Sequence, residues 1–333
     1  ALRHIVTGLG GRIDGVTRQS SFDITPASEV MVIMSLATSL KDLRERLGRI
    51  VIGRSKSGKW ITAEDLQAAG AMTALLRDAL QPNLLRTSEN TPVLIHTGPF
   101  GNIATGCSSV VADLIAAQHA DYVVTEAGFG ADMGAERFFD LKCAVSGLRP
   151  HAAVLVTTVR SLKSHSGKFK ITAGKGLPEQ MMAESPQDVR AGQANLLKHI
   201  EIVRNFGVQP VVAINAFPTD FDSEHEAIRR IAEEAGARVA IHHGVAEGGK
   251  GTVDLANVVA EACDDVSNLE YTYDLEDSLE TKLEKVATKV YGADGISIAP
   301  AAAKQLKRFA DLGYSHLPVV IAKTHLSISS DAS

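Results

Sequence analysis

The sequence predicts an α/β protein in which a mostly parallel β-sheet is covered by helices on both faces. Short apolar runs recur along the 333 residues, and amphipathic helical patterns separate them. Strands that alternate with helices are joined by crossover connections, which pair the strands in parallel. Several runs are continuously apolar, as strands covered on both faces must be. The predicted strands are 92–96, 121–125, 153–157, 210–214, 238–241 and 318–322.

Apolar residues at positions i, i+3 and i+4 predict helices between these runs. The predicted helices are 107–119, 188–206, 222–235 and 253–263. Ser185, Asp222 and Ser223 stand where N-cap residues belong, because their side-chain oxygens can accept the first free amide hydrogens of a helix. The Gly-containing, polar stretch 163–184 is predicted to be a mobile surface loop.

The chain is long enough for two domains. We expect residues 1–209 to form part of a central α/β region and residues 210–333 to form a second α/β domain. The boundary between them is placed just before the apolar run 210–214.

The composition favours small-molecule chemistry. The net charge is −5 and no run of Lys or Arg stands out, so we expect no nucleic-acid partner. No apolar stretch reaches the ~20 residues that span a bilayer, and the first residues do not resemble a signal peptide, so we expect a cytoplasmic protein without a membrane partner. The three cysteines are far apart and form no C-x-x-C pair, which disfavours a disulfide framework or a zinc site.

Residues 53–59 match the phosphate-binding pattern G-x-x-x-x-G-K. The next residue, Trp60, cannot supply the hydroxyl that Mg²⁺ needs. The helix that should begin at once starts later, at Thr62, with Asp65 completing a capping box. A hairpin turn at Ser57-Gly58 is therefore favoured over a phosphate loop. The remaining alternative is a nucleotide-binding switch built on this segment.

Aromatic residues follow two of the predicted strands, at the edge where open parallel sheets bind their ligands. Phe129 stands between Gly128 and Gly130, which allow the backbone to present its ring to a flat ligand. Burial of that ring in the core is the competing interpretation.

The second aromatic loop follows the apolar run 210–214. Asn215 is suited to read the edge of a base while Phe217, followed by Pro218, contacts its face. A plain turn that ends at Asp220 is the alternative, because such residues are common in turns.

Charged residues also follow the predicted strands. Glu126 stands where nucleotide-hydrolysing sheets place the acid that holds Mg²⁺ or its water, with a capping or salt-bridged carboxylate as an equal alternative. Arg160 and Lys163 are candidates to neutralise a phosphate or carboxylate, although exposed cations are usually only solvated. His242-His243 has no companion at metal-ligand spacing, so zinc is not expected.

Taken together, these segments resemble formate–tetrahydrofolate ligase. The resemblance runs almost end to end, through long motifs in the same order: FDIT (22–25), HTGPF (96–100), VTEAGFGAD (124–132), AINAFPTD (213–220) and YGADG (291–295). It implies a P-loop NTPase-like fold with added domains and an ATP-driven condensation of formate with tetrahydrofolate through formyl phosphate. It further implies Mg²⁺, a monovalent cation (K⁺ or NH₄⁺), tetrahydrofolate with or without a polyglutamate tail, and a homotetramer at full length.

The resemblance also implies roles for individual residues. Phe129 would contact the pterin, and Phe217 and Pro218 would flank the nucleotide or folate. Gly248 and Gly249 would shape the same cleft. The candidates for cation, water or anion contacts are Glu126, Asp132, Asn102 and Arg160.

The sequence departs from the family pattern in three respects. The family's phosphate loop would lie upstream of Ala1 and a further segment beyond Ser333, so we expect this chain to be inactive alone. Val245 stands where the family usually has a Trp that stacks on a planar ligand, a contact worth ~1 kcal/mol. The segment 163–184 is longer than expected. The alternative function is a non-catalytic, truncated scaffold or assembly partner with the same fold.

Overall fold

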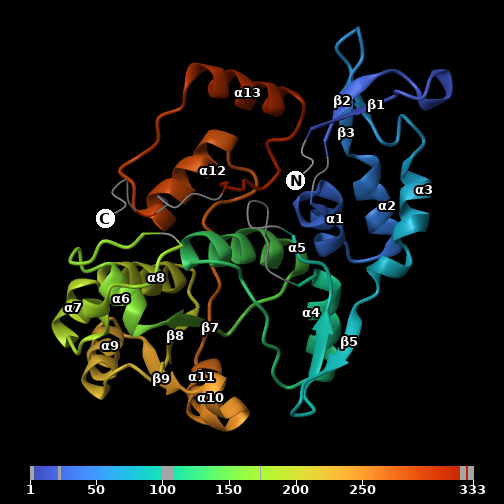
Figure 1. Ribbon diagram of the computed structural model, residues 1–333. Helices are drawn as coiled ribbons and strands as arrows, with labels where there is room; N and C mark the ends of the chain where they lie inside the picture. The colour runs from blue at the N-terminus through green and yellow to red at the C-terminus, as the bar shows by residue number, and fades with distance from the viewer. Residues whose placement is uncertain (1–3, 22–23, 100–107, 173, 323–327, 329–333) are drawn as a thin grey trace. The chain divides into compact units, whose positions relative to one another are not determined.

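The computed structural model describes residues 4–21, 24–99, 108–172, 174–322 and 328. The chain divides into two compact units, Ala1–Gly128 and Phe129–Ser333, and both combine helices with strands (Figure 1). The chain is therefore α/β, as predicted. The position between residues 209 and 210 lies inside the second unit, where a strand begins at Gln209. None of the described helices is long and apolar enough to cross a lipid bilayer.

The first unit consists of short helices and antiparallel strand pairs. The pairs are β1 (Ile5–Thr7) with β2 (Arg18–Ser20), β3 (Val51–Arg54) with β4 (Trp60–Thr62), and β5 (Asn83–Arg86) with β6 (Pro92–Ile95). Its α-helices are α1 (Glu29–Leu36), α2 (Leu40–Gly48), α3 (Ala69–Leu76) and α4 (Val110–His119). Its 3₁₀ turns are η1 (Arg12–Asp14), η2 (Thr25–Ala27) and η3 (Asp78–Leu80). Met34, Leu43 and Leu47 form its buried centre.

The hairpin predicted at Ser57-Gly58 is confirmed. It joins β3 to β4, with Gly58 in the left-handed region at φ +85° and the Ser55 N–H donating to the Lys59 carbonyl at 2.8 Å. No helix begins directly after this turn, so no helix N-terminus stands where a phosphate loop would need one. Thr62 and Asp65 make the reciprocal capping-box hydrogen bonds, but α3 begins only at Ala69, so the predicted helix start was wrong.

The prediction of a mostly parallel sheet is wrong for the described part of the first unit. Residues 92–95 do form a strand, β6, but it pairs antiparallel with β5 across a tight turn at Asn90. Residues 121–125 are irregular, and their apolar side chains, Tyr122 and Val124 among them, are exposed. An apolar run becomes a strand only where a neighbour completes its backbone hydrogen bonds, and this run has no such neighbour among the described residues. The predicted strand 318–322 is irregular as well.

The second unit is built on the parallel sheet β7-β8-β9. The strands are β7 (Ala152–Thr157), β8 (Gln209–Asn215) and β9 (Arg238–His242), with β8 in the centre. All three predicted strands in this region are confirmed to within a residue at each end.

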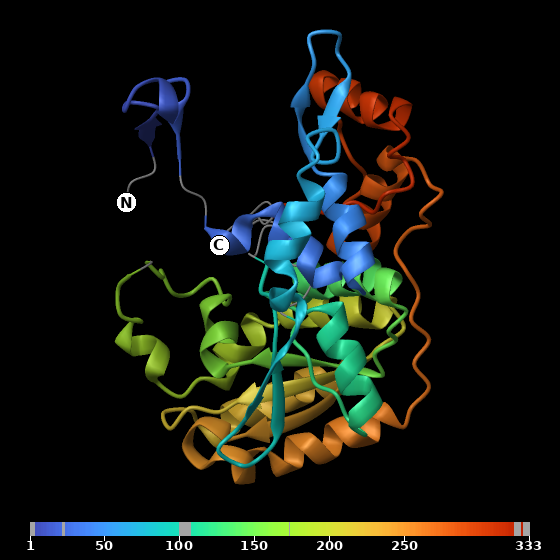
Figure 2. The same ribbon diagram turned by 90° about the vertical axis from the view of Figure 1, so that its right-hand side faces the viewer.

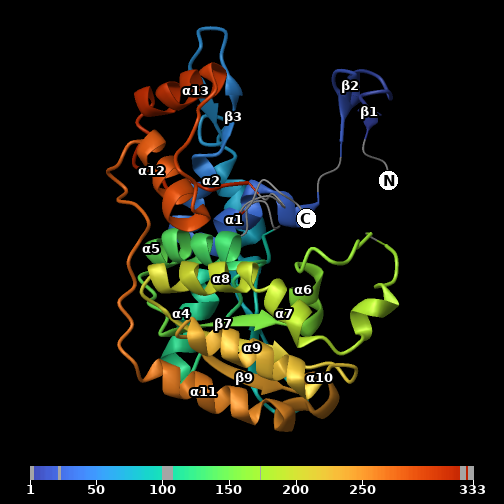
Figure 3. The same ribbon diagram turned by 90° about the vertical axis from the view of Figure 1, so that its left-hand side faces the viewer.

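Helices cover both faces of this sheet, as predicted (Figure 3). Val212 and Ile214 of β8 pack with α8 (Ala194–Asn205) and α9 (Asp222–Glu234). The alternate residues Val211 and Ala213 are also fully buried, and α11 (Val253–Cys263) packs against β8 and β9. The shorter helices of this part are α6 (Val159–Ser164), η6 (Glu179–Met182), α7 (Pro186–Ala191), α10 (Gly244–Glu247) and η7 (Gly248–Thr252).

The predicted helix 188–206 is two helices, α7 and α8, which are separated at Gly192. A Cβ at Gly192 would lie 1.7 Å from the Leu162 carbonyl oxygen, so only glycine allows this approach. Ser185 caps α7 as predicted, and its hydroxyl accepts the Asp188 N–H at 3.3 Å.

Two further helices are close to their predicted ranges, because α9 ends one residue before 235 and α11 matches 253–263. The N-cap prediction for Asp222 and Ser223 is wrong. The helix α9 already includes Asp222, and Glu224 accepts the Phe221 N–H at 3.2 Å instead.

A largely π-helical stretch opens the second unit. Its first two parts, η4 (Ala131–Ala135) and η5 (Phe138–Cys143), are buried, and α5 (Ala144–Ser146), which follows them, is not. Phe139 packs on Phe206, the residue directly after α8, with ring centroids 4.8 Å apart. An irregular segment, residues 264–278, runs along one side of the unit from α11 to α12 (Figure 2). The last helices are α12 (Leu279–Lys285), η8 (Val286–Tyr291) and α13 (Pro300–Asp311).

A buried ion pair anchors the segment 163–184 to the body of the second unit. Lys163 pairs with Glu224 of α9, and both side chains are almost fully buried. The Lys163 ammonium also donates to the carbonyls of Met181 and Ala183, at 3.1 and 2.8 Å. The Lys163 ammonium is therefore occupied by contacts within the protein, and the prediction that it neutralises a ligand is wrong.

Replacing Lys163 with Met is expected to cost about 3–5 kcal/mol of the free energy of unfolding, because it leaves a buried, unpaired carboxylate. Adding Glu224→Gln removes that charge, so the double variant should lose less. Urea unfolding of the two variants beside the parent measures this difference. A Lys163→Met variant within about 1 kcal/mol of the parent would show that the pair contributes little.

Candidate functional site

The parallel register places the ends of β7, β8 and β9 at one edge of the sheet. Thr157 pairs with Ile214, and Asn215 pairs with His242. The Ala216 N–H then donates to the His242 carbonyl at 3.2 Å, which ties the start of one loop to the end of the next strand. The loops that follow the three strands therefore share this carboxyl edge, where open parallel sheets bind ligands.

Arg160 connects the first two of these loops. Its guanidinium carbon lies 4.1 Å from the centroid of the Phe217 ring, and Nη2 donates to the Thr219 hydroxyl at 2.8 Å. A planar cation stacked on an aromatic face is held in orientation as well as attracted. The Arg160 Nε–H is buried and has no acceptor among the described residues. The stacked guanidinium thus keeps a donor that suits an anionic ligand.

The Phe217 loop is a turn stabilised by its own acidic residue. Asp220 Oδ2 accepts the Phe217 N–H at 3.0 Å and lies 3.3 Å from Nε2 of the buried His225. Asn215 is half-buried at the end of β8, and Pro218 is exposed. The plain-turn interpretation is therefore correct for the backbone, and Phe217 is held in place by it.

The loop after β9 is shaped by glycines. A Cβ at Gly251 would lie 2.7 Å from the His243 carbonyl carbon, and Gly248 takes a positive φ of +63°. The Gly249 carbonyl accepts the Thr252 hydroxyl at 2.9 Å. Val245 on α10 is 89% exposed, so this position has room for a larger side chain.

Phe129 begins the second unit in the left-handed region, at φ +67°. Phe129 is 56% exposed, so the competing interpretation, burial in the core, is wrong. Asp132, in η4, is buried, and its Oδ1 lies 3.9 Å from Nδ1 of His199 on α8. The structure thus presents the Phe129 ring outward and directs Asp132 inward to a histidine.

The remaining predicted site residues belong elsewhere. Glu126 and Gly128 lie in the first unit, and Glu126 is exposed in an irregular segment rather than at the end of a strand. Asn102 lies outside the described residues. Among the described residues no group of three or more His, Cys, Asp or Glu side chains is arranged to hold a metal ion. That Phe129 and Phe217 face the same cleft, as the resemblance implies, stays a prediction.

Sequence reasoning missed a pair of buried carboxyl groups in η4 and η5. Both oxygens of Glu136 are buried without a hydrogen-bond donor among the described residues, and burial, reinforced by Asp140, raises its pKa well above the ordinary value. Asp140 accepts the Thr272 N–H at 2.7 Å, and burial raises its pKa to about 6. The available signal was the presence of acidic residues between the apolar side chains of residues 131–143.

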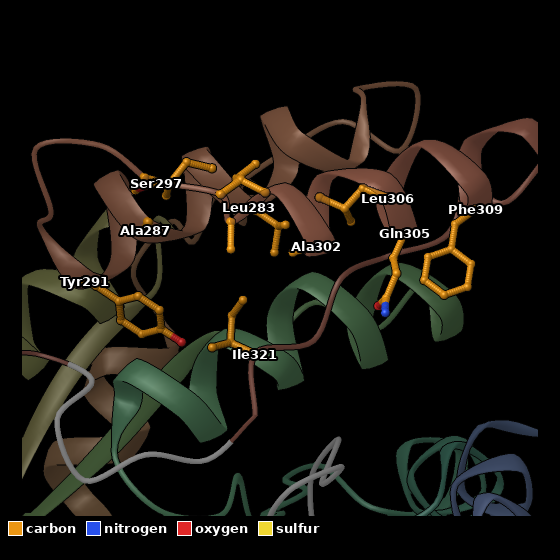
Figure 4. Close-up of a pocket in the computed structure, with 12 residues that line it drawn as sticks. Leu283, Ala287, Tyr291, Ser297, Ala302, Gln305, Leu306, Phe309 and Ile321 are labelled. Carbon is orange, nitrogen blue, oxygen red and sulfur yellow. The ribbon is translucent and has the colours of Figure 1, made fainter.

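A separate hollow of about 580 Å³ lies in the C-terminal part of the second unit (Figure 4). It is lined by Leu283, Ala287, Tyr291, Ile296, Ser297, Ile298, Ala299, Ala302, Gln305, Leu306, Phe309 and Ile321. None of these side chains is charged, so the hollow is poorly suited to the phosphates of a nucleotide. The carboxyl edge of the sheet, with Arg160, is the better candidate.

Comparisons with known proteins agree with the resemblance found in the sequence. The family model described as formate–tetrahydrofolate ligase matches residues 1–333. The chain is 64% identical over 333 residues to the formate–tetrahydrofolate ligase of Cutibacterium acnes and 62% identical over 332 residues to that of Saccharopolyspora erythraea. It is 55% identical over 332 residues to that of Roseiflexus sp.. These alignments cover 99–100% of the chain but 59% of each relative, so the chain spans about three fifths of their length.

Replacing Glu136 with Gln is expected to change how stability depends on pH. A carboxyl whose pKa is raised by folding binds more protons in the folded than in the unfolded state, so the parent loses stability as pH rises above about 4.5. Gln does not titrate, so the variant should gain stability relative to the parent between pH 4 and pH 8. Urea unfolding across this range tests it, with the exposed Glu234→Gln as control. Parallel pH profiles for Glu136→Gln and the parent would contradict the expectation.

Proposed function

The chain belongs to the formate–tetrahydrofolate ligase family, and we propose that it forms the tetrahydrofolate- and nucleotide-contacting part of an enzyme that makes 10-formyltetrahydrofolate from formate, ATP and tetrahydrofolate. The observation that carries the proposal is the stacked pair of Arg160 and Phe217 at the carboxyl edge of the sheet. It combines a fixed cation and a flat ring, which suit an anionic group and a planar heterocycle.

The chemistry requires formate to be activated. A formate oxygen attacks the γ-phosphorus of ATP, ADP leaves, and formyl phosphate forms. A folate nitrogen then attacks the formyl carbon, the C–O bond to phosphate breaks, and the nitrogen loses a proton. Positioning and neutralisation of charge carry both steps.

In this proposal each loop of the second unit has one task. Arg160, with its buried Nε–H, neutralises charge on a phosphate or carboxylate. Phe129 contacts the pterin, while Phe217 and Pro218 flank the nucleotide or folate. Asn215 reads a ring edge, and Val245, Gly248 and Gly249 border the same cleft.

Cations and assembly complete the proposal. Glu126 is an exposed carboxylate that fits a single-ligand role for Mg²⁺, which usually binds through one or two carboxylates together with substrate phosphates. Asp132 and Asn102 remain candidates for cation or water contacts. On the basis of family membership we further propose a P-loop NTPase-like arrangement, a monovalent cation (K⁺ or NH₄⁺), a homotetramer and a cytoplasmic location.

The activity is tested with the polypeptide at its natural length. We expect formation of ADP that depends on both formate and tetrahydrofolate. Replacing Arg160 with Ala should lower kcat/KM about 10- to 100-fold, the effect of losing one charge-assisted hydrogen bond, and Arg229→Ala on α9 serves as control. If the natural polypeptide forms no ADP, the ligase proposal fails and a non-catalytic assembly partner becomes the better account.

Replacing Val245 with Trp is expected to tighten tetrahydrofolate binding. An added aromatic stacking contact is worth ~1 kcal/mol, which corresponds to about a fivefold lower Kd. The matched control is Val266→Trp, because Val266 is 88% exposed and lies outside the three loops. Calorimetric titration measures both variants. An equal change in the two, or none at Val245, would contradict the assignment of this loop.

A further inference from the structure

The turn that presents Phe129 needs an external contact to hold it. A bulky residue in the left-handed region is disfavoured by roughly 1–2 kcal/mol, and Phe129 has a φ of +67°. The residue is nevertheless 56% exposed, so burial in the core does not supply the compensation. The backbone of the residues that follow Phe129 helps to hold this conformation.

His199 of α8 supplies that contact. Its Nδ1 accepts the Ala131 N–H at 3.2 Å, two residues after Phe129. A Cβ at Gly130 would lie 2.7 Å from His199 Cε1 and 2.4 Å from Asp132 Oδ1. The backbone of the turn therefore lies directly on the imidazole, and only glycine allows this approach.

The hydrogen bond specifies the state of the ring. Nδ1 accepts a hydrogen bond only when it carries no proton, so the neutral ring has its proton on Nε2. Burial has the largest effect on His199 and lowers the pKa of its ring. Asp132 raises this pKa, and His165 lowers it. The lowered pKa favours the neutral ring, in which Nδ1 can accept this hydrogen bond.

We propose that His199 is a positioning residue for folate binding: by accepting the Ala131 N–H it holds the Phe129 turn so that the ring faces a planar pterin. The inference rests on the proposed function, because it takes Phe129 as a contact to tetrahydrofolate. His199 acts only through the turn. Its loss should therefore affect tetrahydrofolate and leave ATP and formate unaffected.

Three variants of the natural-length protein test the role. His199→Leu keeps the bulk but removes the acceptor, and should raise the KM for tetrahydrofolate roughly tenfold, as expected for one lost hydrogen bond, with kcat within about twofold. His199→Asn places Oδ1 near the position of Nδ1 and should remain within about threefold of the parent. Gly130→Ala displaces the turn from the other side and should reproduce the effect of His199→Leu even if that variant folds poorly.

A double-variant cycle separates positioning from general packing. In a Phe129→Ala background, His199→Leu should add no further increase in KM, because the ring it positions is gone. Additive effects, an Asn variant as impaired as the Leu variant, or equal losses for ATP and tetrahydrofolate would overturn the proposal. A parent without ligase activity refutes the proposed function itself, whereas an active parent with an unaffected His199→Leu variant refutes only the role of His199.

Discussion

The parallel hydrogen bonding of β8 to β7 on one side and β9 on the other is the constraint on which the rest of the second unit depends. Because β8 is buried on both faces, its register against both neighbours is fixed, and a slip of one residue would turn its buried side chains to the wrong face. The same register fixes where each strand ends. It thereby places Arg160, Phe217 and the loop that contains Val245 at one edge.

Buried polar contacts hold the loops of the second unit in place. The ion pair of Lys163 with Glu224 anchors the start of the segment 163–184, and the Lys163 hydrogen bond to the Ala183 carbonyl anchors its end. His199 does the same for the Phe129 turn, and Asp220 for the Phe217 turn. In each case a polar side chain forms hydrogen bonds with backbone groups of a loop, and in the Phe129 turn the aromatic residue stays exposed.

Much of this architecture could be predicted from the sequence, and the failures have physical causes. The runs 153–157, 210–214 and 238–241 were recognisable because each is short, mainly apolar and followed by a helical pattern. The run 121–125 is also short and largely apolar, but it is irregular, because pairing depends on a neighbouring strand that no local pattern reveals. The hairpin at Ser57-Gly58 was predictable from local turn chemistry alone.

In the candidate site, too, features that depend on neighbouring residues could be predicted, and contacts between distant residues could not. Phe129 between two glycines indicated an exposed ring, and the structure has it exposed. The prediction that Lys163 neutralises a ligand was wrong because its ion-pair partner, Glu224, lies 61 residues away in the sequence. The hydrogen bond of His199 with Ala131 could not be predicted from the sequence either, since the two residues are 68 positions apart. The burial of the carboxyl groups of Glu136 and Asp140 could not be predicted either, because it depends on the assembled core.

Hydrogen-exchange measurements on the natural-length protein, with and without tetrahydrofolate and a nucleotide, test the central claim most directly. If the carboxyl edge of β7, β8 and β9 forms the binding site, the backbone amides of residues 129–131, 216–221 and 243–252 should become protected when the ligands bind. Protection confined to α12, α13 and the apolar hollow between them, with these three loops unchanged, would contradict the account.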